Sequence, residues 1–428
     1  MMDESPPMAA LGELVELQNK KAFSGKDLRL PYVGLEHIAQ GAPTLLGTAD
    51  SSSSVSVNSL FEKDDILFGK LRPNLRKSLR APFRGYCSTD ILVLRCREGI
   101  VPGFAGHVFQ WQRVFAAASA TAAGTRMPRA SWDDLKRLYV FAPKSELAQE
   151  AIATVLNAVE DAIAKTGAVI VKLRQLRSGM LDDLLTRGLD EKGQLRDPVA
   201  LPEWFQESPV GRIPKVWRFS AFSEVLDRID SGKSPDYADC PAPPGEWGLL
   251  KVSAIWPEGF RANENKWVTK AMHKNQAYEV QDGDLLISRS NTYALVGLVC
   301  LVRKPPPRLL LCDKTLRLRV RLTCASPHFF ALLLQTRSAR RQIEIHATGT
   351  SGSMKNISQN VIRSLKLAYP LPEEQHRVLR ELAPLDESLA ALGREFDKLT
   401  SIKSGLTTDL LTGRVRVPES ILSTEAPG

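Results

Sequence analysis

The strongest constraint on the fold of this chain is an internal repeat of unusually long period. Met127 and Pro143 recur as Met354 and Pro370, each 227 positions later, and the segment 183–186 (Asp-Leu-Leu-Thr) recurs 226 positions later. Solenoid repeats return every 20–50 residues or so, so this period indicates a whole domain with its connector, duplicated in tandem. Two such copies can lie about a pseudo-two-fold axis, which suits a two-part target.

The composition predicts a cytoplasmic protein with a polyanionic partner. The net charge of +9 favours a nucleic acid over a basic partner, although many proteins are mildly basic. The six cysteines form no C-x-x-C pair, which indicates a reducing compartment. The acidic N-terminus does not resemble a signal peptide, and the longest apolar run, 294–302, is far shorter than the roughly 20 residues of a membrane span.

Each half consists of a mixed, loop-rich block followed by a helical block, which predicts an α+β fold. In the second block Leu316, Leu318 and Val320 alternate with arginines, so we expect a half-exposed strand with one basic face. The expected divisions are a first mixed domain (1–144), a first helix (145–188), a connector (189–216), a second mixed domain (217–371), a second helix (372–413) and a flexible tail (414–428).

Both helical blocks carry apolar residues at steps of three and four, which is typical of a coiled-coil seam. We expect the two helices to cover each other. Packing of each helix on its own mixed domain, or pairing between two chains, remains open. The expected pairing positions are Ile152, Val159, Ile163, Leu173 and Met180 in the first helix and Val378, Leu385, Leu392, Phe396 and Leu399 in the second.

The sequence lacks the motifs of a catalytic or cofactor-binding protein. Gly232-Lys233-Ser234 resembles the end of a phosphate loop, but Asp227 stands where the motif requires glycine, so we expect an ordinary loop. The tetrads Asn-Pro-Pro-Tyr and Asp-Pro-Pro-Tyr are missing, so the chain itself is not expected to methylate an exocyclic amine. We therefore predict a non-enzymatic chain that binds neither a metal nor a cofactor.

Basic residues cluster at matching places in the two mixed blocks, 66–97 and 303–321. Lysine and arginine at this density can neutralise phosphates, and arginine near serine, asparagine and threonine can read base edges. A solvated charged face is the alternative. The candidate DNA-binding residues are Lys70, Arg72, Arg76, Lys77, Arg126, Arg129, Arg289, Ser290, Asn291, Thr292, Lys314, Lys355 and Asn356. In the repeated loops around Met127 and Met354, we expect the methionines to pack into the core.

Over nearly its whole length the chain resembles the specificity subunit of a type I restriction–modification system, and in the second half the resemblance is specific. The resemblance is carried by three stretches: 208–217 (SPVGRIPKVW), 282–289 (DGDLLISR), and 354–358 (MKNIS) followed by 370–375 (PLPEEQ). The first half departs from this pattern. It lacks the Gly-x-Ile-Pro-x-x-Trp start, and it has Ala148-Gln149 for the Glu-Gln step and Lys70 without the Ser-Arg pair.

The resemblance implies two target-recognition domains, each reading half of a split, asymmetric DNA sequence, and two long antiparallel helices between them. Methyltransferase subunits would bring S-adenosylmethionine, and a restriction and translocase subunit would use ATP. The 33 residues from Val378 to Leu410 would span roughly 50 Å as a helix, against about 34 Å for one turn of DNA, so the helices could act as a ruler. The alternatives are a protein-binding coiled-coil scaffold, a self-sufficient methyltransferase or nuclease, and a degenerate subunit.

Overall fold

The computed structural model describes residues 6–23, 30–50, 57–122, 127–349 and 354–418. The chain divides into two compact units. The first unit combines Met1–Val169 with Leu392–Gly428, and the second unit is Ile170–Ala391. The long helices α5 (Glu146–Thr186) and α9 (Pro372–Leu411) each contribute residues to both units. The domain boundaries expected from the sequence remain predictions.

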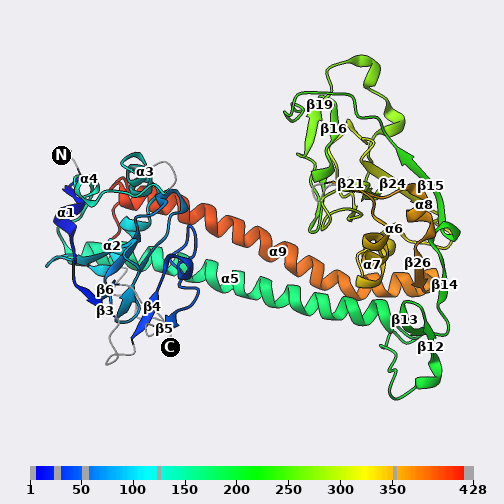
Figure 1. Ribbon diagram of the computed structural model, residues 1–428, viewed down its shortest axis with the longest axis horizontal. Coiled ribbons are helices and arrows are strands. Elements are labelled where there is room, and N and C mark those ends of the chain that lie inside the picture. The colour runs from blue at the N-terminus through cyan, green and yellow to red at the C-terminus, as the bar shows by residue number, and fades with distance from the viewer. Residues whose placement is uncertain (1–5, 24–29, 51–56, 123–126, 350–353, 419–428) are drawn as a thin grey trace. The chain divides into compact units, whose positions relative to one another are not determined.

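The described residues of the first unit form three sheets and four short α-helices besides the long ones (Figure 1). Its sheet orders are β1-β11, β2-β10-β7-β8 and β3-β6-β9-β4-β5. The strands are β1 (Met8–Ala10), β2 (Val15–Leu17), β3 (Lys21–Phe23), β4 (Pro31–Val33), β5 (Ala49–Asp50), β6 (Val57–Phe61), β7 (Ile66–Gly69), β8 (Ser78–Arg80), β9 (Gly85–Cys87), β10 (Ile91–Cys96) and β11 (Tyr139–Phe141). The helices are α1 (Leu11–Leu14), α2 (Pro102–Gln110), α3 (Gln112–Ala120) and α4 (Trp132–Leu135).

The second unit contains a four-stranded sheet, β15-β24-β20-β22, a three-stranded sheet, β19-β16-β23, and four two-stranded sheets, β12-β13, β14-β26, β17-β18 and β21-β25. The strands are β12 (Phe205–Ser208), β13 (Gly211–Pro214), β14 (Arg218–Ala221), β15 (Leu226–Ser231), β16 (Gly248–Leu250), β17 (Ile255–Trp256), β18 (Gly259–Phe260), β19 (Asn265–Trp267), β20 (Leu285–Ser288), β21 (Ser290–Asn291), β22 (Val299–Leu301), β23 (Leu309–Leu310), β24 (Thr315–Val320), β25 (Lys355–Asn356) and β26 (Lys366–Tyr369). The helices are α6 (Pro327–Leu333), α7 (Arg337–His346) and α8 (Gln359–Ser364).

The four-stranded sheets of the two units have the same topology. The order β2-β10-β7-β8 becomes β15-β24-β20-β22, and the pair β1-β11 becomes β14-β26. Each four-stranded sheet is followed by a helix with proline at its first turn, where the missing N–H is tolerated. The predicted α+β fold, with two mixed domains each followed by a long helix, is confirmed. Among the described residues, the β12–β13 hairpin has no counterpart before β1.

Contacts between α5 and α9 follow one antiparallel register. In the first unit Lys403 Nζ lies 2.7 Å from Glu160 Oε1, and a Cβ on Gly167 would lie 3.4 Å from the ring of Phe396. In the second unit Arg177 forms an ion pair with Asp386. The residue numbers of each pair add up to the same total, as antiparallel pairing requires. The repeat also relates the two ion pairs, because Glu160 and Arg177 lie 226 positions before Asp386 and Lys403.

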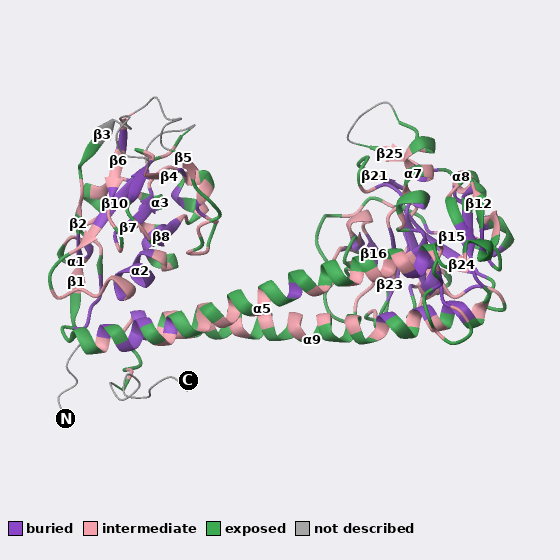
Figure 2. Cartoon of the chain, turned by 90° about the horizontal axis from the view of Figure 1, so that it is seen from below, coloured by how far each residue is buried: buried purple, intermediate pink, exposed green. Residues whose placement is uncertain are grey.

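The expected pairing positions on α5 and α9 differ in burial. Ile152 and Val378 are buried in the cores of their units, and the other eight positions are half-buried. A seam between two helices leaves its flanks open to solvent, so partial burial is the normal outcome. Figure 2 shows that most buried residues belong to the mixed domains rather than to the middle stretches of the helices. The role of each position in pairing remains a prediction.

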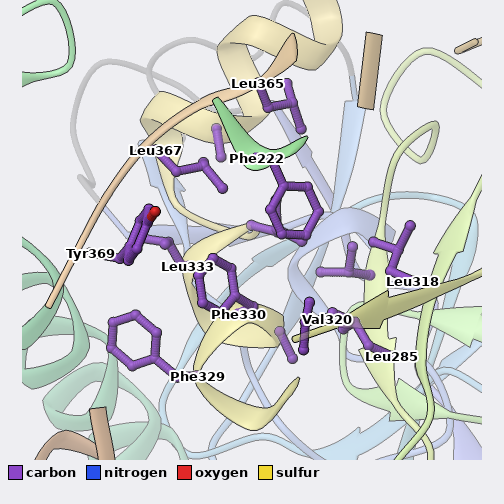
Figure 3. Close-up of a cluster of buried hydrophobic side chains, with 14 of the residues drawn as sticks. Phe222, Leu285, Leu318, Val320, Phe329, Phe330, Leu333, Leu365, Leu367 and Tyr369 are labelled. Atoms are coloured by element: carbon purple, nitrogen blue, oxygen red, sulfur yellow. The ribbon is translucent and has the colours of Figure 1, made fainter. Parts of the chain in front are cut away.

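The largest core lies in the second unit and is built around aromatic side chains (Figure 3). Phe222 and Phe330 stack with their ring centroids 5.5 Å apart, and Phe330 also contacts Tyr369 of β26. Leu318 and Leu285 of the four-stranded sheet belong to the same cluster. This core packs α6, the four-stranded sheet and the β14–β26 pair together. It therefore supports strand β20, at whose end the candidate site lies.

A buried glutamine joins each mixed domain to the start of its helix. In the first unit Gln149 accepts a hydrogen bond from the N–H of Val101 (2.8 Å) and donates to the carbonyls of Gly99 and Pro143. In the second unit Gln375 makes the equivalent three bonds, to Ser326, Cys324 and Pro370. Both side chains are fully buried, so the two units share this connection atom for atom.

Candidate nucleic-acid interface

The arginines of β24 do not form the exposed basic face expected from the sequence. Arg317 is only 3% exposed and donates to Asp230 (2.9 Å) and Asp284 (3.0 Å). Arg319 donates to the same two carboxylates. The alternation of leucine and arginine correctly predicted a strand. It could not show that Asp230 of β15 and Asp284, directly before β20, pair with these arginines. These cations stabilise the sheet.

The first unit contains a similar charge pair, in which the acid is buried and the arginine is partly exposed. Arg95 of β10 makes a bidentate bond to Asp65, with both N···O distances 2.8 Å. In the second unit, burial opposes ionisation of Asp230, yet the hydrogen bonds from Arg317 and Arg319 hold the pKa of its carboxyl below the usual value. Both units therefore use part of their predicted basic cluster for internal pairing.

A smaller group of the predicted residues meets at the end of β20. The N–H of Arg289 donates to the carbonyl of Lys314 (2.8 Å), and the carbonyl of Arg289 accepts from the N–H of Ile357 (3.0 Å). This clamps the backbone of Arg289 on both sides, while its side chain is exposed. Lys314 is exposed as well. The exposed cations of Arg289 and Lys314 therefore lie next to each other on a backbone fixed by hydrogen bonds.

Strands β21 and β25 bring further predicted residues to this point. Ser290 pairs with Asn356 and Asn291 with Lys355 in antiparallel register. The hydroxyl of Ser290 donates to Asn356 Oδ1, and Lys355 Nζ donates to the carbonyl of Gly349 (2.6 Å). Thr292 follows directly and is exposed. The structure thus groups all seven residues predicted for the second half.

The loop after Arg289 is held in place from beneath. Ser288, which is fully buried, donates through its hydroxyl to the carbonyl of Leu295 (2.8 Å). Arg340 of α7 donates to the carbonyl of Val296 (2.6 Å). Tyr293 stands between these anchors, and 52% of its surface is exposed. Sequence reasoning missed Tyr293, although an aromatic residue next to Ser-Arg-Ser-Asn-Thr could have signalled a base contact.

The first unit reproduces this backbone arrangement around Lys70. The N–H of Lys70 donates to the carbonyl of Asp90 (3.0 Å), and its carbonyl accepts from the N–H of Ala130 (2.9 Å). Leu71 forms a bridge with Arg129, as Ser290 does with Asn356. Lys70, Asp90 and Arg129 therefore correspond to Arg289, Lys314 and Asn356. The common backbone carries different side chains in the two units.

The equivalent positions differ in charge. Arg129 Nε donates to Asp90 Oδ1 at 2.8 Å, and Nη2 donates to Oδ2 at 3.3 Å. These hydrogen bonds raise the pKa of the Arg129 guanidinium above its usual value. In the second unit a lysine and an asparagine occupy the two positions. The site of the first unit thus contains an acid that the second site lacks.

The other candidates of the first unit are placed differently. Arg72 and Arg76 are exposed and have positive φ angles of 50° and 51°. Arg76 donates to Gln112, and Lys77 Nζ donates to the carbonyl of Leu35 (2.6 Å). Lys77 is therefore engaged within the first mixed domain. Arg126 lies outside the described residues.

The prediction that the repeated methionines pack into the core is wrong. Met127 is 55% exposed and Met354 is 47% exposed. Each precedes by two residues the residue that bridges to the Lys70 or Arg289 strand, namely Arg129 or Asn356. Both side chains are therefore exposed to solvent, two residues before a residue of the candidate site. The sequence alone does not show whether an apolar loop residue points into the core or into solvent.

The phosphate-loop resemblance has a packing explanation. A Cβ on Gly232 would lie 1.8 Å from the carbonyl oxygen of Leu311, so only glycine fits there. Ser234 is hydrogen-bonded to Asp313. Across the described ranges, no group of three or more His, Cys, Asp or Glu side chains could hold a metal ion. None of the helices in that part of the chain is long and apolar enough to cross a membrane.

Comparisons with known proteins agree with this architecture. Residues 214–400 match the family described as the Type I restriction modification DNA specificity domain. The type I restriction enzyme EcoEI specificity subunit of Escherichia coli is 29% identical over 192 residues, which are 45% of this chain and 32% of that protein. The EcoKI specificity subunit of Escherichia coli strain K12 is 23% identical over 343 residues, 78% of this chain and 68% of that protein. The match thus covers only about a third of the EcoEI subunit.

Solved structures show the same fold. The S subunit of a type I restriction–modification system from M. genitalium has a TM-score of 0.59 at 16% identity, covering 96% of this chain and 98% of that one. A chain described with the complex assembly and conformational transition of the type I R-M system has a TM-score of 0.50 at 18% identity, covering 97% of this chain and 100% of that one.

The chain thus contains two duplicated mixed domains, each ending in a long helix, as these solved structures do. With the family match in its second half and the fold match over nearly all its length, the chain is similar to the type I restriction–modification specificity subunits.

Proposed function

We propose that this chain is the non-catalytic DNA-recognition subunit of a type I restriction–modification complex. The observation that carries the proposal is the common backbone site at Lys70 and Arg289. Both residues leave the end of a buried strand, are clamped through their N–H and carbonyl groups, and stand beside a bridging loop residue. A rigid backbone with exchangeable side chains is a suitable design for a reader of DNA bases.

The side chains at the two sites support an asymmetric, bipartite target. Arg129 and Asp90 at the first site are replaced by Asn356 and Lys314 at the second. Different donors and acceptors select different base pairs in the major groove. Exposed cations such as Arg289 and Lys314 would contact phosphates and supply most of the affinity. Each mixed domain would then read its own half-site.

The long helices support a role as the frame of the complex. Helices α5 and α9 have 41 and 40 residues, and their contacts follow one antiparallel register. We infer that methyltransferase subunits dock on this frame, bringing S-adenosylmethionine, and that a restriction and translocase subunit joins with ATP. The frame would set the unread gap between the half-sites.

Two measurements test the proposal. The full-length chain, alone and with its methyltransferase subunits, is titrated with duplex DNA at increasing salt. We expect the logarithm of the affinity to fall linearly with the logarithm of the salt concentration. Methylated adenines are then mapped in DNA from cells that express the chain with its methyltransferase. A two-part motif with a fixed gap is expected.

Other outcomes would assign a different function. Binding that does not respond to salt, with partner proteins still captured, would identify a protein-binding coiled-coil scaffold. Methyl transfer by the purified chain alone would identify a self-sufficient enzyme. Methylation of a single undivided motif would contradict the two-reader assignment.

A further inference from the structure

We propose that Arg129 reads a guanine in the first half-site and that Asn356 reads an adenine in the second. This inference rests on the proposed function and adds the residue and the base at each site. The two residues lie 227 positions apart and make the same bridge to the residue after the clamped cation. They are therefore equivalent in space within their own units but differ in chemistry.

Arg129 is held in the orientation that base reading requires. Asp90 accepts from Nε and Nη2 of the guanidinium, which leaves the edge formed by Nη1 and the second proton of Nη2. The backbone holds Asp90 in turn, because its carbonyl accepts from Lys70 N–H. A guanidinium edge matches the O6 and N7 acceptors of guanine, which is the commonest specific contact of arginine with DNA. Asp90 thus acts as a positioning residue.

Stabilisation alone does not account for the Arg129–Asp90 pair. The Arg129 side chain is 46% exposed and that of Asp90 is 24% exposed. Ion pairs with an exposed partner contribute little to stability. Arg129 also keeps three N–H donors that Asp90 does not use, whereas Arg317 uses its donors on carboxylates and backbone carbonyls. We therefore infer that Asp90 orients the Arg129 side chain and does not serve to compensate a buried charge.

Asn356 is oriented by a different partner. The hydroxyl of Ser290, which is 7% exposed, donates to Asn356 Oδ1. The Asn356 backbone is fixed by two hydrogen bonds with Thr348, N···O 2.8 and 2.9 Å. Among the described residues no partner of Asn356 Nδ2 is present, and Oδ1 keeps a second lone pair. An N–H of Nδ2 and the second lone pair of Oδ1 can then match N7 and N6 of adenine.

The exchange of Asp90 for Lys314 follows from this assignment. A carboxylate at position 314 would face no arginine at position 356, and it would repel the phosphates near Arg289. A lysine there instead adds a phosphate contact. At the first site the carboxylate is retained because Arg129 needs it for orientation. The two sites therefore differ both at the reading residue, Arg129 or Asn356, and at its neighbour, Asp90 or Lys314. Both differences are expected if the two sites read different bases.

The test uses the full-length chain with its methyltransferase subunits and a library of random duplex DNA. Bound duplexes are sequenced for the wild type, Arg129→Ala, Arg129→Lys, Asp90→Asn and Asn356→Ala. The wild type is expected to select at least one guanine in its first half-site and one adenine in its second. Arg129→Ala and Asn356→Ala should each reduce the preference at one base by about tenfold to a hundredfold, in their own half-site only.

Two variants distinguish reading from charge. Arg129→Lys keeps a cation but loses the planar fork, so total binding should persist while the guanine preference is lost. Asp90→Asn removes the carboxylate that orients Arg129 and should weaken the same guanine preference. The matched controls are Arg84→Ala, an exposed arginine paired with Glu62, and Asn360→Ala, an exposed asparagine of α8. Both controls should select the wild-type sequence.

The assignment is overturned if Arg129→Lys or Asn356→Ala selects the same bases as the wild type, or if the lost preference is for another base. It is also overturned if the change occurs in the other half-site. Selection of a two-part sequence by the wild type would uphold the proposed function in each of these cases. A wild-type complex that selects no sequence would overturn both.

Discussion

Glu374 Oε1 accepts a hydrogen bond from the indole N–H of Trp217 at 2.9 Å, and both side chains are buried. The same carboxylate pairs with Arg196 through two bonds of 2.7 and 2.9 Å and accepts from the N–H of Leu189. Glu374 therefore ties the connector and the start of the second mixed domain to the first turn of α9. The equivalent residue in the first half is Ala148, which cannot form these bonds.

Replacing Glu374 should destabilise the second unit strongly. Glu374→Gln keeps the shape but leaves Arg196, which is 8% exposed, without a counter-charge. Breaking a buried ion pair in this way costs about 3–5 kcal/mol. Urea unfolding followed by tryptophan fluorescence measures the loss, and the exposed neighbour Glu373→Gln serves as the control. A loss below about 1 kcal/mol would show that Arg196 finds solvent or another partner.

Arg289→Ala should weaken binding to the second half-site only. Its backbone is clamped by Lys314 and Ile357, so the substitution removes an exposed cation without disturbing the strand. We expect a decrease in affinity of about 1–2 kcal/mol and a shallower salt dependence. Titration with duplexes that carry one half-site each separates the effects. Equal losses on both duplexes would contradict the assignment of one half-site to each mixed domain.

Shortening both helices in register should shorten the unread gap. Residues 165–171 of α5 lie opposite 392–398 of α9 in the register defined by Glu160–Lys403 and Arg177–Asp386. Deleting both segments removes about 10 Å of helix, or about three base pairs of DNA, and keeps both ion pairs. Deleting 165–171 alone breaks the register and should abolish assembly. Methylation mapping reads the gap, and an unchanged gap after the paired deletion would refute the ruler.

The first unit should lose stability as the pH falls below about 6.5. Burial lowers the pKa of His107 from its usual value of 6.5, although Glu160 and Asn157 partly oppose this shift. Between the two pKa values the unfolded chain binds a proton that the folded chain does not. The contribution of neutral His107 to the free energy of unfolding is therefore fully present above pH 6.5 and decreases as the pH falls towards the pKa of the folded state. His107→Gln, which does not titrate, should show a smaller decrease between pH 7.5 and 5.5 in urea unfolding. A variant with the same pH dependence as the wild type would assign the effect to another group.

The repeat could be predicted because it is written directly in the sequence, and the long helices α5 and α9 because helical periodicity depends on local spacing. Gln149 and Gln375 recur 226 positions apart, and each performs the same three hydrogen bonds. Pro384 lies inside α9 and did not enter the prediction, yet the helix continues through it. Helical periodicity is a property of neighbours in the chain, so the sequence carried it without knowledge of the fold.

Which cations are exposed was decided only by tertiary structure. Arg317 lies within β24 and Arg289 directly follows β20, but only Arg317 is covered by Asp230 and Asp284, whereas the Arg289 side chain is exposed. Those acids lie 87 and 33 positions before Arg317. The outward direction of Met127 and Met354, and the exchange of Asp90 for Lys314, likewise depend on contacts between distant segments. Composition and the repeat period determined that the chain has two related, basic halves, each with a long helix. Contacts between strands that are distant in the sequence decided which of the charged side chains are exposed.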